Sequence, residues 1–291
     1  AVRADFFGGK TPDCGGNLAA AVGGCDPMSD FRESIFLKRA EAGEALTDVL
    51  VIDGHCHMGP YFGFHIPDNG IGAMVRVMDR VGIDTIIASP HVAIGPDFRL
   101  GNDLIAEAMQ RYPGRVLGYA FLNPRYEDGV LDELERCVSF GMRQIKLHNC
   151  NGYPYDGERY RPAYELANEQ GFPILAHTWG KEAEVFDSLA EEYPNISFIL
   201  AHAGVVDFDT YVKLGKTRPN IYLDQATSQV GYGWIERFVE EVGAEKILFG
   251  SDMPFLSAPQ QIGKVLYARI SDADKRKILG ENVKRIFRLD S

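Results

Sequence analysis

Two histidines stand at the end of an apolar run in this sequence. The segment "VIDGHCHMGP" covers residues 51–60 and places His55 and His57 two positions apart. Because alternate side chains of a strand point to the same face, we expect these two imidazoles to converge and Cys56 to face away. Two converging imidazoles can bind a metal ion or share a polar network. The pair alone leaves both possibilities open, together with two unrelated surface histidines.

Polar residues also occur at the ends of seven further apolar runs. In chain order the eight runs carry His55 with His57, His91, Asn123, Lys146 with His148, His177, His202, Gln225 and Asp252. Six of the seven histidines are in this set, which a random scatter of surface histidines would not produce. The carboxyl ends of the strands of a β/α barrel form one ring around the catalytic mouth. We therefore expect these side chains to meet there.

This ring offers nitrogen and oxygen donors to a divalent cation. We expect His55, His57, His177 and Asp252 to bind one ion, with water in an open position. Zinc is the first choice, and Mn²⁺, Fe²⁺ or Co²⁺ would suit the same donors. Asp252 has a second possible role that competes with metal binding, because an aspartate in "LFGSD" could instead be the N-cap of the next helix.

Other ring residues have roles that the sequence leaves open. His202 is predicted as a further ligand or as an acid/base group. Lys146 and His148 share a strand face, so either could contact substrate, or His148 could support a ligand. His91 could contact substrate or be a structural histidine, and Trp179 is predicted to contact substrate.

The elements that position these residues follow a β–α rhythm. The apolar runs cover residues 48–55, 84–91, 115–124, 144–150, 173–179, 196–204, 220–227 and 246–254. They are continuous rather than alternating in polarity, as in strands buried on both faces of a parallel sheet. Helical patterns such as 71–82, 102–112, 129–141 and 181–193 separate them. Eight such units predict an α/β protein with a (β/α)₈ TIM barrel. An open doubly wound sheet is the alternative, but no glycine-rich phosphate fingerprint follows the first run.

The two ends of the chain are predicted to lie outside the repeat. Residues 1–48 form an N-terminal extension, glycine-rich at first and then helical over 26–48, that packs on a barrel domain of residues 49–291. Residues 271–287 predict a final helix, which begins with a capping pair of Ser271 and Asp274.

Composition limits the classes of partner. The net charge of −11 argues against nucleic acid and anionic membranes as partners. No apolar run is long enough to span a bilayer, and no signal-peptide pattern is visible. Five widely spread cysteines predict free thiols in a reducing cytoplasm. We expect a cytoplasmic homo-oligomer that acts on a small anionic molecule.

Five motifs within residues 49–288 resemble the amidohydrolase superfamily, and most closely its amidohydrolase-2 branch of metal-dependent hydrolases with a TIM-barrel fold. They are "DGHCH", "ILAHTWG", "FILAHAG", "ILFGSDMPF" and "ILGENVKRIF". The resemblance implies a metal bound by His55, His57, His177 and Asp252, with His202 close by. It also implies that Lys146 either bridges two metals as a carbamate or binds a substrate anion.

The resemblance leaves two chemistries open. A hydrolase would use a metal-activated water on a small carboxylate-containing ester, lactone or amide, with Asp252 moving the proton. This broader class is the main prediction. The alternative is a non-oxidative decarboxylase of an aromatic or unsaturated acid, in which His202 or Asp252 protonates carbon. Some relatives instead hydrate double bonds, and a barrel that only binds a ligand is a third, weaker interpretation.

Overall fold

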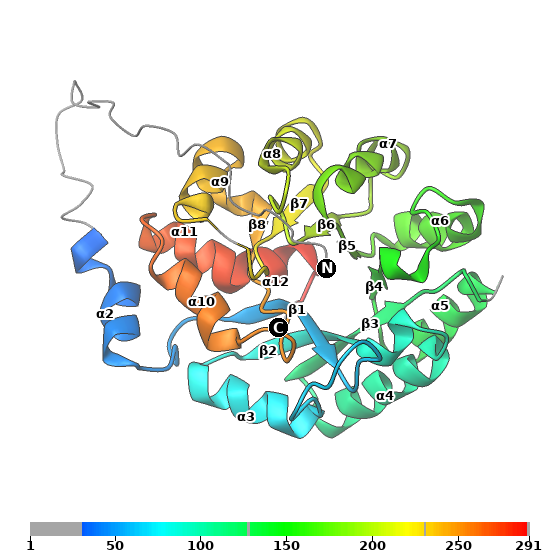
Figure 1. Ribbon diagram of the computed structural model, residues 1–291, viewed down its shortest axis with the longest axis horizontal. Coiled ribbons are helices and arrows are strands. Elements are labelled where there is room, and N and C mark those ends of the chain that lie inside the picture. The colour runs from blue at the N-terminus through cyan, green and yellow to red at the C-terminus, as the bar shows by residue number, and fades with distance from the viewer. Residues whose placement is uncertain (1–30, 127–128, 230, 290–291) are drawn as a thin grey trace, which may run out of the picture.

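Eight parallel strands form a barrel in the computed structural model, which describes residues 31–126, 129–229 and 231–289 (Figure 1). The strands are β1 Ile52–Met58, β2 Thr85–Pro90, β3 Val116–Phe121, β4 Gln144–Leu147, β5 Ile174–His177, β6 Phe198–Ala201, β7 Ile221–Asp224 and β8 Ile247–Leu248. The helices are α2 Ile35–Ala42, α3 Ile71–Val81, α4 Phe98–Arg111, α5 Val130–Ser139, α6 Arg161–Gln170, α7 Val185–Glu192, α8 Phe208–Thr217, α9 Trp234–Val242, α10 Ala258–Leu266, α11 Asp272–Arg276 and α12 Asn282–Ile286. This arrangement confirms the predicted (β/α)₈ barrel.

The barrel closes between its first and last strands. Each strand pairs in parallel with the next in sequence, from β1 to β8. The segment that follows β8 then returns to β1, where the amides of Gly54 and His57 donate to the carbonyls of Phe249 and Met253 at 3.0 and 2.8 Å. The register of β1 shifts between Asp53 and Cys56, next to this seam. The predicted metal ligands of β1 therefore lie where the barrel closes.

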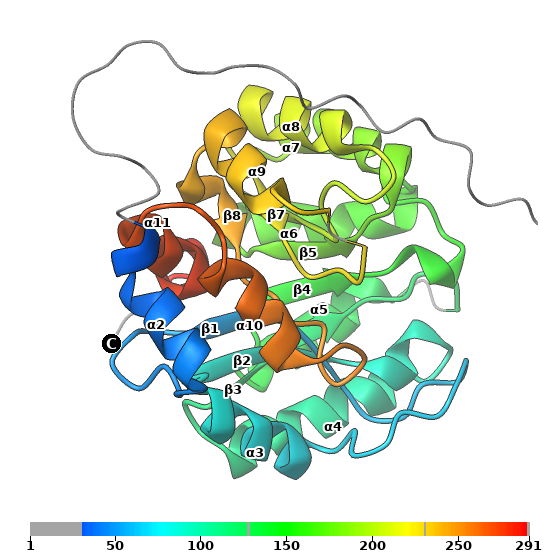
Figure 2. The same cartoon turned by 60° about the vertical axis from the view of Figure 1, so that its left-hand side comes forward.

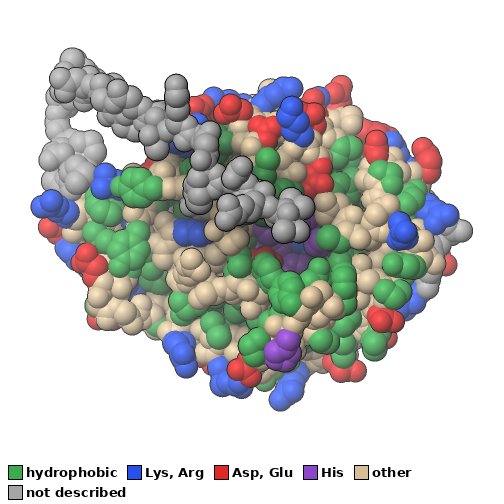
Figure 3. Space-filling view, in the orientation of Figure 1, with side chains coloured by type: hydrophobic (Ala, Val, Ile, Leu, Met, Phe, Trp, Pro, Cys, Tyr) green, Lys and Arg blue, Asp and Glu red, His purple; other side chains and the backbone are tan. Residues whose placement is uncertain are grey.

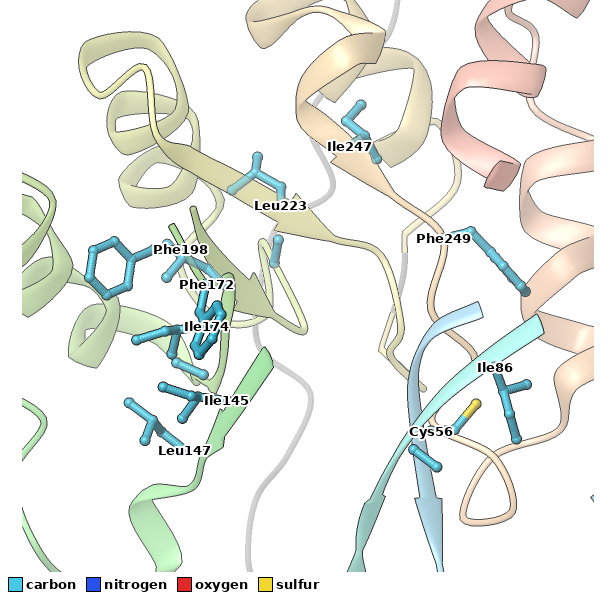
Figure 4. Close-up of a cluster of buried hydrophobic side chains, with 14 of the residues drawn as sticks. Cys56, Ile86, Ile145, Leu147, Phe172, Ile174, Phe198, Leu223, Ile247 and Phe249 are labelled. Carbon is cyan, nitrogen blue, oxygen red and sulfur yellow. The ribbon is translucent and has the colours of Figure 1, made fainter. Parts of the chain in front are cut away.

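Apolar side chains fill the layer between the strands and the outer helices. Figure 4 labels ten of them: Cys56, Ile86, Ile145, Leu147, Phe172, Ile174, Phe198, Leu223, Ile247 and Phe249. Cys56 is fully buried in this outer layer, so it faces away from the barrel interior as predicted. The alternation along β1 thus leaves His55 and His57 for the interior.

A second apolar cluster closes the interior at the end opposite the histidines. Ile52, Ile87, Leu175, Ile199 and Leu248 from five strands pack there, together with Val283 and Ile286 of α12 and Phe287 just after it. At this end, the described part of the barrel interior is therefore filled by packed side chains. This fixes the carboxyl ends of the strands as the place for chemistry.

The segment before the barrel is helical in two pieces. Residues 31–33 are helical, and after a break at Ser34 the helix α2 begins with Ser34 as its N-cap, whereas the predicted start near Pro27 or Ser29 lies outside the described residues. Ser34 Oγ donates to Asp272 at 2.5 Å, and α2 lies beside α10 and α11 (Figure 2). Residues 1–30, which carry the glycine-rich part of the predicted extension, lie outside the described residues.

The final helix begins where the sequence predicts. Ser271 Oγ accepts a hydrogen bond from the amide of Asp274, as a capping pair should. The helix is not uniform, because a π-helical turn at Lys277–Glu281 joins α11 to α12. Ile278 and Leu279 of this turn are fully buried.

Candidate metal centre and active site

The predicted ring of polar side chains is present at the mouth of the barrel. Strand β1 carries His55 and His57, β4 carries Lys146, and β5 ends on His177. His202 directly follows β6, and Asp252 lies four residues past β8. Apart from His177, which is slightly more exposed, these side chains are buried. Figure 3 shows histidine atoms at the floor of a hollow bordered by hydrophobic side chains.

Three of these residues form a compact donor triangle. His55 Nε2 and His57 Nε2 are 3.3 Å apart, and Asp252 Oδ1 lies 3.6 and 3.3 Å from them. Two donors that are each about 2.1 Å from one tetrahedral ion would be about 3.4 Å apart. The triangle therefore has the size that a shared divalent cation requires. Two nitrogens and one carboxylate oxygen fit zinc, and they fit Mn²⁺, Fe²⁺ and Co²⁺ as well.

The hydrogen bonds behind the imidazoles present their lone pairs to this point. His55 Nδ1 donates to Asp224 Oδ2 at 2.5 Å, because an ionised carboxylate can only accept. His57 Nδ1 lies 3.0 Å from Ser89 Oγ, whose own hydroxyl faces the carbonyl of Cys56 at 3.4 Å. Both rings therefore carry their proton on Nδ1 and have an unprotonated Nε2, which for His55 accepts from Lys146 in this structure. A carboxylate behind a histidine is the usual support for a metal-binding imidazole.

The backbone fixes Asp252 beside His55. Asp252 has a left-handed φ of 56°, and its amide donates to the carbonyl of His55 at 2.8 Å. Asp53 Oδ1 accepts from the amides of both His55 and Ser251, at 3.2 and 2.9 Å. Asp53 thus ties together the two segments that carry the donors. The competing N-cap role for Asp252 is wrong, because α10 begins at Ala258 and its N-cap is Ser257.

Burial dominates the electrostatics of the cluster. It lowers the pKa of His55 to about 3 and that of His57 well below its usual value. Both imidazoles are therefore neutral at pH 7, which is the form that binds metals. Burial lowers the pKa of Lys146 to about 8, and its ammonium lies 2.9 Å from His55 Nε2. It also raises the pKa of Asp252 to about 8, against the effect of the Lys146 charge.

The other predicted site residues occupy different parts of the mouth. His177 Nδ1 lies 3.1 Å from His202 Nε2, and His202 Nδ1 donates to the carbonyl of Ala226 at 2.5 Å. His202 Nε2 must then accept, so His177 carries its proton on Nδ1. The donor atoms gathered within 4.8 Å of one another are those of His55, His57 and Asp252. His177 is not in that group, and its ligand role stays a prediction.

A cavity of about 160 Å³ opens above the donor triangle. Its lining includes His91, His148, His177 and His202 as well as His57 and Asp252. The remaining wall consists of Tyr61, Phe64, Ile94, Cys150 and Phe255. Tyr61 and Phe64 therefore form part of the pocket wall. Two predicted substrate contacts, Lys146 and Trp179, do not line this cavity.

The contacts of His91, His148 and Trp179 around the mouth are defined by the structure. His91 Nδ1 donates to the carbonyl of Gly59 at 3.1 Å, which leaves its Nε2 as an acceptor. His148 Nδ1 accepts from the amide of Cys150 at 3.2 Å, so its Nε2 is a donor. Trp179 is 39% exposed and stacks at 6.4 Å on His177. It adjoins the mouth from outside the cavity.

The sequence pattern misses two residues of the site. In the seventh run it singles out Gln225, whereas Asp224 is the residue that contacts His55. Gln225 instead donates to the carbonyl of Gly250. An acid at the last position of a buried strand was the available signal for Asp224. Ser89 carries no comparable signal, because a serine before a proline is common in turns.

The amidohydrolase family model matches residues 52–289. The chain belongs to the amidohydrolase family. The match covers the whole barrel and the final helix, and it confirms the resemblance seen in the motifs. This amidohydrolase is therefore an enzyme of a family whose members include hydrolases and decarboxylases.

Curated relatives of this amidohydrolase are decarboxylases. Gamma-resorcylate decarboxylase of Rhizobium sp. (strain MTP-10005) is 25% identical over 286 residues, which covers 74% of this chain and 86% of the relative. The 2-amino-3-carboxymuconate-6-semialdehyde decarboxylase of Dictyostelium discoideum is 22% identical over 235 residues, covering 65% of this chain and 66% of the relative.

A solved structure shares the fold of this amidohydrolase. The dihydroxybenzoic acid decarboxylase from Polaromonas sp. JS666, with bound manganese and the inhibitor 2-nitroresorcinol, has a TM-score of 0.67 and 21% identity. It covers 84% of this chain and 98% of the other. Within the described residues of our chain, no helix has the length and apolarity needed to cross a membrane.

Proposed function

We propose that this amidohydrolase is a divalent-metal-dependent, non-oxidative decarboxylase of a small aromatic or unsaturated acid. The observation that carries the proposal is the similarity to gamma-resorcylate decarboxylase over 86% of that relative. The sequence motifs alone favour a hydrolase, because that is the broader class. The relatives support the alternative chemistry.

The donor triangle supports the metal requirement of this proposal. His55, His57 and Asp252 would hold the cation, and His177 is the proposed fourth ligand. A bound divalent cation supplies a Lewis acid beside the carboxylate of the substrate. The choice among zinc, manganese, iron and cobalt is open to direct measurement, since all four fit these donors.

Asp252 is the group best suited to deliver the proton. Its Oδ1 faces the two imidazoles and the residue lines the cavity, so we propose that Oδ2 carries the proton. The proton moves from Asp252 to the ring carbon that bears the carboxylate. The bond from that carbon to CO₂ then breaks, and its electron pair restores the ring. Asp252 is left ionised and regains a proton from water.

His202 is a weaker candidate for this role. Its Nδ1 proton is held by the carbonyl of Ala226, and its Nε2 accepts from His177. Burial lowers the pKa of His202 to about 4, so little of the protonated form exists at neutral pH. A general acid is most effective when its pKa lies near the working pH. We propose instead that His202 orients His177 through the hydrogen bond between them.

The test is a paired product assay on metal-loaded protein. Dihydroxybenzoates and lactones are incubated with the enzyme in D₂O or in H₂¹⁸O, with zinc or manganese added. We expect CO₂ release equal to acid consumed and one deuterium on the ring carbon that lost CO₂. Turnover should stop with a chelator and return with added metal. Lactone opening with ¹⁸O in the product and no CO₂ from any acid would establish the hydrolase instead.

A further inference from the structure

A second cavity adjoins the one above the donor triangle. It measures about 490 Å³, about three times the 160 Å³ of the metal-side cavity. Its lining residues are Pro60, Tyr61, Phe62, Val92, Ile94, Gly95, Pro96, Asp97, Tyr126 and Cys150. They come from the segment after β1, the segment between β2 and α4, and the loops after β3 and β4. The cavity therefore lies on the catalytic face of the barrel.

Three side chains belong to both cavities. Tyr61, Ile94 and Cys150 line the metal-side cavity and the second cavity alike. Ile94 is buried in a small cluster with Phe98 and Phe121, against which Tyr61 packs. Tyr61 also lies 5.6 Å, ring to ring, from His91. Within the described residues, these three side chains form the wall that the metal-side cavity and the larger space share.

The charge of the two cavities restricts what can occupy them. Of the described residues that line either one, none is lysine or arginine. The acidic lining residues are Asp252 beside the donors and Asp97 in the second cavity. One carboxylate of a substrate would meet positive charge at the proposed cation site beside His57 and Asp252. A second carboxylate in the larger cavity would face Asp97 with no cation in the wall, which disfavours it.

We infer that the second cavity is a subsite for an apolar substituent of the substrate. This inference rests on the proposed function. The substrate is then a monocarboxylic aromatic acid whose alkyl or aryl group extends past Tyr61, Ile94 and Cys150 into the second cavity. The carboxylate stays at the donor triangle. The wall of Val92, Ile94, Phe62 and Tyr126 supplies apolar contact for the substituent. Dicarboxylic acids of similar size are poor substrates.

The test uses a homologous series of ligands. Phenols with methyl, propyl and pentyl substituents, which are products of the proposed reaction, are titrated calorimetrically into the metal-loaded protein. The matching hydroxybenzoates are assayed for CO₂ release. A few added methylenes in an apolar pocket change recognition by about tenfold or more. We expect the pentyl compound to bind at least tenfold tighter than the methyl compound, and kcat/KM to follow.

Two variants at the shared wall locate the effect. Cys150→Phe narrows the passage and should abolish the gain along the series, whereas Cys150→Ala should keep it. The amide of Cys150 that holds His148 is backbone and persists in both, and a thermal melt checks that each variant folds. No gain in the native chain, or an unchanged gain in Cys150→Phe, overturns the inference. A gain in binding without CO₂ from any acid supports the subsite and refutes the decarboxylase.

Discussion

Asp224→Asn should weaken metal binding although Asp224 is not itself a donor to the cation. Asp224 Oδ2 accepts from His55 Nδ1 at 2.5 Å, and Oδ1 accepts from the amide of Ala226 at 2.9 Å. An asparagine cannot replace both bonds. If its oxygen faces Ala226, its NH₂ group faces His55 and forces the ring proton to Nε2, where the cation should bind. If the amide is turned, its NH₂ group opposes the amide of Ala226.

The size of the effect follows from this loss. Removing a hydrogen-bond partner behind a metal-binding histidine typically costs about 10- to 100-fold in metal affinity. That range equals about 1.4–2.7 kcal/mol of binding free energy. Asp224 is buried, so solvent cannot substitute for the lost bond. The loss should therefore lie toward the upper part of the range.

The assay is competition with a chromogenic chelator, which gives the dissociation constant of zinc or manganese at fixed pH. Asp209→Asn is the matched control, because it removes the same charge from an exposed position on α8. It should bind metal like the native chain. A dissociation constant for Asp224→Asn within twofold of native would refute the role of Asp224 in orienting His55.

Three further predictions concern the same seam. Asp252→Asn should still fold, because asparagine tolerates a φ of 56°. Its turnover, measured as CO₂ release with metal saturation checked by elemental analysis, should be at least about 100-fold slower than that of the native chain. Near-native turnover would disprove the role of Asp252 as the proton donor. Gly250→Ala should lower metal affinity at least about tenfold by the chelator assay, because its Cβ would lie 2.3 Å from Asp224 Oδ1, whereas Gly263→Ala, with open space around it, should not. Burial raises the pKa of Asp53 to about 6. Between pH 4 and 6 the folded metal-free chain therefore keeps a proton on Asp53 that the unfolded chain has lost. The free energy of unfolding should consequently fall as the pH rises through this range. In urea titrations at several pH values, the free energy of unfolding of Asp53→Asn should depend less on pH over this range. An identical pH dependence in the variant and the native chain would show that Asp53 does not have a raised pKa.

Much of the architecture could be predicted because it depends on local patterns. Continuous apolar runs and amphipathic helices at regular intervals specify a barrel, and strand alternation separates Cys56 from its histidine neighbours. The strand-end rule then places the polar residues at one mouth. The ring was therefore predictable as a set.

The finer geometry depends on contacts between distant segments, which no local pattern encodes. Asp224 and Gln225 are adjacent in sequence, and only the pairing of β7 with β8 decides which one meets His55. The cap role of Asp252 was plausible locally, but the helix begins at Ala258. Likewise, the single helix predicted over 26–48 is interrupted at Ser34, whose side chain contacts Asp272, over 200 residues away.

The closing seam also determines when the site can exist during synthesis. His55 and His57 are made about 200 residues before their partner Asp252. The bond from Ser251 to Asp53 spans 198 positions of sequence. Such distant contacts form late, because the intervening chain must first be ordered. A nascent chain therefore carries two exposed imidazoles without a chelating site, and tight metal uptake should mark completion of the eighth strand and closure of the barrel.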